Sequence, residues 1–305
     1  TVHHPLLRRT LRSTITTQAA MNQPLCVIGI LLAAFLFPAS VQAQADTGAI
    51  PYGNNTSAGH VITVRGARIY YETYGKGRPL VLIHGNGGNI AWMKPQIEFF
   101  AQRYQVLVMD CRGRGRSELG KDSLSYLQMA EDIVAMLDRE HADSAYVVGR
   151  SDGGIIALLL AIHHPEKVCK VAAFAANLTP DTSALYPFFH REVRADRKQA
   201  DSMLARGDTT RNWKVLQQRN RLMEFQPQIT REQLQRIQRP VLVLSTDRDI
   251  IPEEHTLFIY RSIPKSNLCI FTGENHYMTA SNAALFNTTV AKYLEEPFRG
   301  EEQRR

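Results

Sequence analysis

The stretch that decides the fold of this chain is Tyr146-Val147-Val148-Gly149-Arg150-Ser151-Asp152-Gly153-Gly154-Ile155-Ile156-Ala157-Leu158. It is a short apolar, β-branched run, followed by Gly-x-Ser-x-Gly and then by residues typical of a buried helix. A strand that turns sharply into a helix lifts one side chain above the end of a parallel sheet, and the crowded turn requires small neighbours. The pattern predicts such an elbow with Ser151 at its tip. Glycine-rich turns that contain serine are common, so the interpretation depends on the rest of the chain.

Length and composition indicate one α/β domain with an insertion. The chain has 305 residues, of which 44% are hydrophobic, enough for a large core. The formal net charge of +7 falls by three, to +4, once a leader containing Arg8, Arg9 and Arg12 is removed. The remaining sequence has no lysine and arginine tract, so it gives little support to nucleic-acid binding.

The leader resembles an export signal. Residues 25–37 form an uninterrupted apolar run, which Pro38 ends, and Ala43-Gln44-Ala45 follows as a small-x-small cleavage site. The run is short for a bilayer span, so we expect a signal peptide at about 21–45, with Met21 as the start, and no stable membrane span after cleavage. The expected location is the periplasm or the outside of the cell. The alternative is an uncleaved membrane anchor.

Strand-like and helix-like runs alternate along the rest of the chain, which predicts a mostly parallel, doubly wound sheet covered on both faces. The expected strands lie at 60–64, 68–74, 80–83, 106–109, 146–148, 168–174, 241–244 and 267–271, and the expected helices at 92–103, 124–137, 155–164, 253–261 and 280–294. Residues 177–239 break the alternation, because they contain helix-period stretches at 191–206 and 213–225. We therefore divide the chain into a leader at 1–45, a core at 46–176 and 240–305, and a helical cap at 177–239.

An acid and a histidine follow the expected strands beyond Ser151. Asp249 comes after the run at 241–244, and His276 after the run at 267–271. The carboxyl ends of parallel strands share one edge of the sheet, where open α/β sheets build their sites. The order Ser, Asp, His therefore predicts a catalytic triad, with Asp247 as the runner-up for the acid.

Four segments of the chain form a set: His84-Gly85-Asn86-Gly87-Gly88, Asp110-Cys111-Arg112-Gly113-Arg114-Gly115-Arg116-Ser117, the elbow at 149–154, and Asp249-Ile250-Ile251-Pro252 with Gly273-x-x-His276. In these segments the chain resembles the α/β-hydrolase-fold serine hydrolases, and the resemblance extends over nearly all of its mature length. The first segment lies where the family places its oxyanion loop. One departure is Thr246, where a glycine often precedes the acid.

The predicted roles follow from the chemistry of these groups. His276 would accept the proton of the Ser151 hydroxyl, and Asp249 would fix the tautomer of the imidazole and stabilise the imidazolium. The backbone N–H groups of Asp152 and of Asn86, with Gly87 as the less favoured alternative to Asn86, would bind the oxyanion. No cofactor is needed. No cysteine and histidine cluster has the spacing of a metal site. Three cysteines follow the leader, and we expect no structural disulfide.

Other conspicuous residues have a structural interpretation beside the functional one. His84 is expected to shape its loop, and His163 and His164 to interact with the end of a helix. Arginines 112, 114 and 116 are expected to stabilise a turn rather than to bind an anionic substrate. The cap residues Tyr186, Phe188, Phe189, His190 and Trp213 could line a substrate pocket, or form the core of the cap.

The sequence thus predicts an exported enzyme that cleaves a small or medium carboxylic ester, or an amide or lactone, through an acyl-enzyme. A cofactor-free perhydrolase or haloperoxidase and a carbon–carbon bond hydrolase use the same triad and stay open. A ligand receptor on the hydrolase fold is the alternative of another class. The partner is a small-molecule substrate. The sequence does not reveal which substrate, or the oligomeric state.

Overall fold

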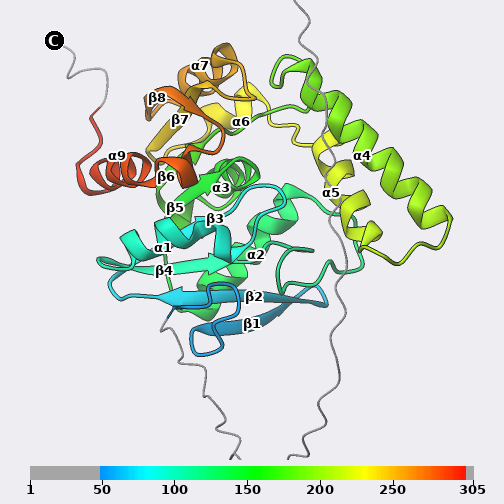
Figure 1. Ribbon diagram of the computed structural model, residues 1–305. Helices are drawn as coiled ribbons and strands as arrows, with labels where there is room; N and C mark the ends of the chain where they lie inside the picture. Colours follow the sequence, from blue (N-terminus) through cyan, green and yellow to red (C-terminus); the bar gives the residue numbers. More distant parts are fainter. Residues whose placement is uncertain (1–48, 300–305) are drawn as a thin grey trace, which may run out of the picture. The chain divides into compact units, whose positions relative to one another are not determined.

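The computed structural model describes residues 49–299 (Figure 1). The predicted leader and signal peptide at 1–45 lie outside the described residues. The described part contains an eight-stranded sheet in the order β1-β2-β4-β3-β5-β6-β7-β8. The strands are β1 (Gly59–Val64), β2 (Ala67–Tyr74), β3 (Arg78–Ile83), β4 (Tyr104–Met109), β5 (Ala145–Arg150), β6 (Val168–Phe174), β7 (Val241–Arg248) and β8 (Ser266–Asn275).

The sheet is mostly parallel, as the alternation of runs predicts. Strand β2 pairs antiparallel with β1 and with β4, and the pairs from β4 to β8 are parallel. The β1–β2 hairpin turns at Arg65 and Gly66, which both have positive φ angles. Two residues of this kind form the tight turn whose twist matches that of the flanking strands. The predicted α/β class is confirmed.

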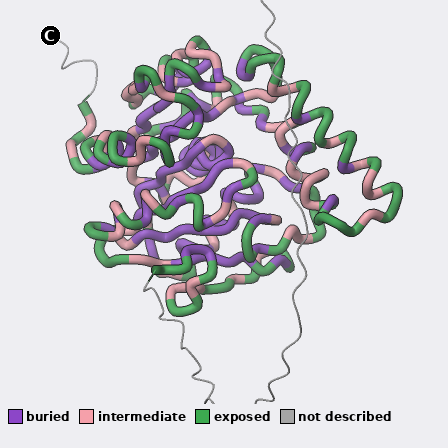
Figure 2. Tube along the Cα trace, in the orientation of Figure 1, coloured by how far each residue is buried: buried purple, intermediate pink, exposed green. Residues whose placement is uncertain are grey.

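The continuous apolar runs are strands buried on both faces. Along β3, Leu80 and Leu82 belong to one hydrophobic core, whereas Val81 and Ile83 belong to the other. Side chains alternate across a strand, so a strand between two cores needs an apolar residue at every position. The buried tube segments at the centre of Figure 2 are these strands and the helix after β5.

Helices cover both faces of the sheet. The core that contains Val81 includes residues of α2 (Tyr126–Arg139), α3 (Asp152–His163) and α7 (Glu253–Ser262). The opposite core includes residues of α1 (Lys94–Phe100) and α9 (Ala283–Glu295). Three short helical segments also belong to this part of the chain: η1 (Ile90–Met93), η2 (Pro165–Lys167) and α8 (Met278–Ser281).

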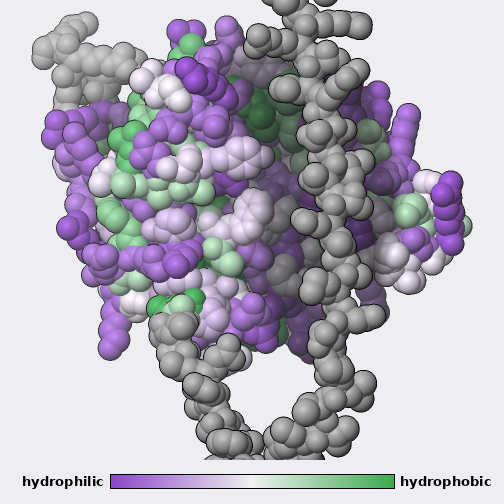
Figure 3. All heavy atoms as spheres, in the orientation of Figure 1, coloured by the Kyte–Doolittle hydropathy of each residue, from purple (hydrophilic) through white to green (hydrophobic). Residues whose placement is uncertain are grey.

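Residues 177–239, all of which the structure describes, contain helices and no strand. Helix α4 (Pro187–Ala205) and helix α5 (Trp213–Phe225) lie side by side (Figure 1), and the short α6 (Arg231–Gln235) follows. The hydrophilic surface of α4 forms the right edge of Figure 3. The bounds of a separate cap domain stay a prediction.

Several expected elements have different bounds in the structure. The helix expected at 280–294 is divided, because Asn282 has non-helical backbone angles (φ −136°, ψ 53°) and its side chain donates a hydrogen bond to Glu274. Strands β7 and β8 are longer than the apolar runs, because polar residues continue the ladder as far as the pair Arg248 and Asn275.

Candidate active site

Ser151 occupies the strained turn between β5 and α3. Its backbone lies in the left-handed region, with φ 55° and ψ −119°. Such a conformation costs a non-glycine residue about 1–3 kcal/mol, and the surrounding structure must hold it in place. The Ser151 N–H donates to the carbonyl oxygen of Phe174 at 2.8 Å, and its own carbonyl accepts from Gly154 at 2.7 Å. These bonds fix the predicted elbow.

The glycines of the elbow are required by close backbone contacts. A Cβ on Gly149 would lie 2.0 Å from the carbonyl oxygen of Gly153. A Cβ on Gly153 would lie 2.2 Å from the carbonyl oxygen of Ile83. No side chain fits at either distance. The Gly-x-Ser-x-Gly spacing therefore has a steric cause in this chain.

The structure brings His276 and Asp249 to Ser151 as a hydrogen-bonded chain. His276 Nε2 lies 3.1 Å from Ser151 Oγ, and Nδ1 lies 2.7 Å from Asp249 Oδ1. A carboxylate only accepts, so Nδ1 carries the proton and Nε2 is free to accept from the serine hydroxyl. Asp249 is held by the Thr246 hydroxyl at 3.2 Å and the Ile251 N–H at 3.3 Å. The arrangement can transfer a proton from the hydroxyl to the imidazole.

Asp247 lies away from the histidine. Its carboxylate accepts from the Gly273 N–H at 2.8 Å and from the Thr272 hydroxyl at 3.1 Å, and the residue is exposed. The Gly273 hydrogen bond holds the pKa of the Asp247 carboxyl below its usual value. Of the two acids considered from the sequence, the structure places Asp249 against His276.

The loop after β3 lies beside the elbow. A Cβ on Gly85 would lie 3.1 Å from the Ser151 Cβ, and the side-chain amide of Asn86 donates to Asp152 at 3.0 Å. The backbone N–H groups of Asn86 and Asp152 donate to no acceptor within the described residues. Both groups are thus free for a ligand oxygen. Whether Asn86 or Gly87 supplies the second oxyanion donor stays open.

His84 has the structural position expected for it. It is buried, its Nδ1 donates to the carbonyl oxygen of Gly85 at 2.8 Å, and its Nε2 accepts from the Cys111 N–H at 3.1 Å. Burial lowers the pKa of His84 to about 4, so the ring is neutral at pH 7. The ring joins the oxyanion loop to the turn after β4.

Sequence reasoning assigned a role to the backbone N–H of Asp152 and missed its carboxylate. It is buried, and it accepts hydrogen bonds from Tyr126 and from Asn86, each at 3.0 Å. The Arg114 guanidinium lies 3.8 Å away. Burial raises the pKa of the Asp152 carboxyl, and the nearby arginine opposes that shift. No local signal in the sequence connects these residues, because they come from four separate segments.

A cavity of about 430 Å³ is lined by Ser151 and His276, and by residues of the oxyanion loop, α4 and α5. Its size is that of a small-ligand site. Of the five cap residues singled out in the sequence, Phe188 and Phe189 line the cavity. Trp213 is buried instead between α4 and α5, where it lines a smaller cavity.

The sequence profile of the α/β-hydrolase fold family matches residues 78–239, just over half of the chain. The chain belongs to this family. It is 41% identical over 102 residues to a protein of Azorhizobium caulinodans named carbamate hydrolase RutD. The matched residues make up 33% of this chain and 38% of the relative. The chain thus spans less than half the length of the first relatives that it matches.

Solved structures of two hydrolases share the fold. An esterase from Exiguobacterium antarcticum has a TM-score of 0.67 at 23% identity, and covers 77% of this chain and 98% of its own. The enol-lactonase from Burkholderia xenovorans LB400 has a TM-score of 0.65 at 20% identity, and covers 78% of this chain and all of its own. At these identities, the two structures show that the chain shares their fold.

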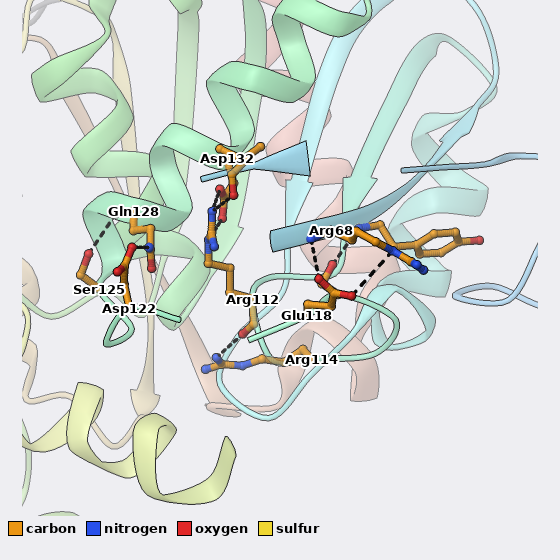
Figure 4. Close-up of polar contacts among 11 residues, drawn as sticks. Arg68, Arg112, Arg114, Glu118, Asp122, Ser125, Gln128 and Asp132 are labelled. Carbon is orange, nitrogen blue, oxygen red and sulfur yellow. Dashed lines mark hydrogen bonds and ion pairs between the residues drawn. The ribbon is translucent and has the colours of Figure 1, made fainter. Parts of the chain in front are cut away.

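The arginine-rich turn after β4 stabilises this α/β-hydrolase fold. Arg112 donates two hydrogen bonds to Asp132 on α2, at 2.6 and 2.7 Å, and both side chains are buried (Figure 4). Arg114 donates to the carbonyl oxygen of Arg112 at 2.8 Å, and Arg116 stacks on the Tyr70 ring. The turn-stabilising interpretation of these arginines agrees with this geometry.

His163 and His164 lie at the end of α3, and an interaction of their rings with the helix end stays a prediction. His164 Nε2 is 2.9 Å from a carboxylate oxygen of Glu131 on α2, and His163 is exposed. Cysteines 111, 169 and 269 are free thiols. Among residues 49–299, no helix is long and apolar enough to cross a bilayer, and no group of acids, histidines and cysteines is placed to hold a metal ion.

Proposed function

We propose that this chain is a serine hydrolase that cleaves a small or medium carboxylic ester, and amides or lactones of similar size, through an acyl-enzyme. The observation that carries the proposal is the hydrogen-bonded chain from Ser151 through His276 to Asp249 at the wall of the cavity. A neutral hydroxyl is a poor nucleophile, and an imidazole of the correct tautomer within hydrogen-bond distance activates it.

The reaction proceeds in two steps. Ser151 Oγ attacks the carbonyl carbon while His276 Nε2 accepts the hydroxyl proton, which it then gives to the departing alcohol. Water, activated by the same nitrogen, attacks the acyl-enzyme and releases the acid. The free N–H group of Asp152, together with that of Asn86 or Gly87, stabilises the oxyanion in both steps. Asp249 stabilises the imidazolium.

The test is a comparison of two serine variants. Ser151→Ala should abolish turnover of a p-nitrophenyl ester and labelling by a fluorophosphonate. The control is Ser57→Ala, at an exposed serine beside β1, which should keep both. Labelling that survives in Ser151→Ala would assign the nucleophile to another residue.

The substrate panel should include a carbamate, because the sequence relatives are named for carbamate hydrolysis and a carbamate carbonyl can react by the same steps. Peroxide-dependent bromination without ester hydrolysis would favour a perhydrolase. Very slow turnover together with a ligand-dependent protein partner would favour a receptor.

Export to the periplasm or the outside is also a proposal, based on the apolar run at 25–37 and the small residues at 43–45. The N-terminus of the mature protein, measured by mass spectrometry on protein from cells, should lie near residue 46. A mature N-terminus before residue 40 would contradict export by cleavage.

A further inference from the structure

Arg219 on α5 is a cation without a protein partner in the wall of the cavity that holds Ser151. Its Nε is buried and makes no hydrogen bond, and no hydrogen bond or ion pair joins its guanidinium to another residue in the described part of the chain. The neighbouring Arg114 and Arg150 also bury an Nε that makes no hydrogen bond, but a terminal nitrogen of each has a protein partner. Arg114 donates to the carbonyl oxygen of Arg112 and lies near Asp152, and Arg150 donates to the carbonyl oxygen of His276 at 3.1 Å.

The Arg219 guanidinium lies against the oxyanion loop. A Cβ on Gly87 would be 3.6 Å from both terminal nitrogens of Arg219. Gly87 directly follows Asn86, whose backbone N–H is a candidate oxyanion donor. A group held by Arg219 would therefore lie close to the reacting carbonyl of a substrate bound at Ser151.

The charges that face Arg219 do not neutralise it. Two carboxylates attract it at longer range, those of Asp152 and Asp196, and Arg114 and Arg211 repel it. Asp152 already accepts two hydrogen bonds and lies near Arg114, and Asp196 is exposed to water. Burial lowers the pKa of Arg219, because the buried guanidinium has lost hydrating water. Such a cation is stabilised when an anion enters the cavity.

Part of the cavity wall suits an apolar group, although the exposed carboxylates of Glu192 and Asp196 also line the cavity. Trp92, Phe188 and Tyr277 line the cavity, and each is a largely exposed aromatic side chain. Exposed aromatic residues around a cavity favour an apolar ligand surface. A ligand with an apolar part and an anion would satisfy both the aromatic side chains and the guanidinium.

We propose that Arg219 binds a carboxylate carried by the substrate, so that this enzyme prefers esters of dicarboxylic acids over neutral esters. The proposal rests on the proposed function and names its substrate class. The planar guanidinium can donate two parallel hydrogen bonds to a carboxylate, which gives orientation as well as affinity. Arg219 is a specificity-determining residue and takes no part in bond breaking.

The kinetic test uses two substrates with the same leaving group and the same acyl length, p-nitrophenyl hemiglutarate and p-nitrophenyl pentanoate. We expect the wild-type enzyme to prefer the hemiglutarate in kcat/KM. Arg219→Gln should reduce that preference by about 10- to 100-fold, the usual effect of losing a hydrogen bond to a charged group. The change should lie mainly in KM for the anionic ester, while kinetics on the pentanoate stay within about threefold.

Two further variants separate charge recognition from a structural role. Arg219→Lys should restore part of the preference, because it keeps the charge and loses the planar fork. Arg221→Gln is the matched control, since Arg221 lies on the same helix, is exposed, stacks on Phe225 and does not line the cavity. It should leave the preference unchanged. An equal loss on both esters in Arg219→Gln, or a preference that stays within twofold of wild type, would overturn the proposal.

A binding measurement keeps the proposal testable if no ester is turned over. Calorimetry on Ser151→Ala should show tighter binding of monomethyl glutarate than of dimethyl glutarate, and Ser151→Ala with Arg219→Gln should lose the difference. Arg219-dependent binding without hydrolysis by the wild type would reject the hydrolase and support the anion site. Hydrolysis of both esters with no effect of Arg219→Gln would reject the anion site and leave the hydrolase intact.

Discussion

Replacement of Asp249 by asparagine tests the electrostatic part of the candidate triad. The Ile251 N–H donates to Oδ1, the same oxygen that accepts from His276 Nδ1, whereas the Thr246 hydroxyl donates to Oδ2. In Asp249→Asn the amide oxygen should therefore take the Oδ1 position, since the Ile251 N–H needs an acceptor. The Thr246 hydroxyl can rotate to accept from the new NH₂. The histidine should keep its tautomer, and the variant should lose the charge.

The size of the effect follows from the distance and the burial. The Asp249 side chain is fully buried, and its oxygen lies 2.7 Å from Nδ1. Coulomb's law at an effective dielectric constant of about 20 gives about 6 kcal/mol of attraction between this carboxylate and an imidazolium. Loss of that attraction in the transition state corresponds to a fall of about 10⁴ to 10⁵ in kcat.

The assay is steady-state hydrolysis of a p-nitrophenyl ester, with thermal melting to verify the fold. The matched control is Asp247→Asn, an exposed acid two positions away whose partners are Gly273 and Thr272. This control should keep kcat within about twofold of wild type. The reasoning is refuted if folded Asp249→Asn retains more than a tenth of the wild-type kcat, or if Asp247→Asn loses more activity than Asp249→Asn.

Two further predictions concern stability. Asp132→Ala should lower the free energy of unfolding by about 3–5 kcal/mol, because it leaves the buried Arg112 guanidinium without its bidentate partner; urea denaturation measures the loss. Burial lowers the pKa of His255 to about 4, below the 6.5 expected for the unfolded chain, so its contribution to stability is present above pH 6.5 and is lost as the pH falls toward 4. Between pH 6.5 and 4.5, the free energy of unfolding of His255→Gln should fall by about 1.4 kcal/mol less per pH unit than that of wild type.

Each stability prediction has a matched control. Glu295→Ala removes the exposed ion pair with Arg103 and should cost less than about 1 kcal/mol. His163 is exposed, and His163→Gln should leave the pH dependence of stability unchanged. A loss for Asp132→Ala no larger than that for Glu295→Ala would contradict the stability assigned to the buried pair. Parallel pH curves for wild type and His255→Gln would contradict the burial argument.

The sequence by itself determined the elements and the elbow. A short run that is apolar at every position predicts a strand between two cores. In the run from Leu80 to Ile83, successive side chains alternate between the two cores. The steric demands around Ser151 are also local, since the glycines at 149 and 153 are needed by the turn itself. Patterns of this kind are readable because each concerns backbone conformation within a few residues.

Only the tertiary structure decided which acid meets the histidine and what else enters the cavity. The β7–β8 register shifts between Thr246 and Arg248, and this bulge at Asp247 leaves that side chain exposed while Asp249 lies buried against His276. Arg219 reaches the oxyanion loop because α5 packs there, which no local pattern encodes. Contacts between distant segments depend on strand register and helix packing, and these are set by the whole core rather than by any one stretch.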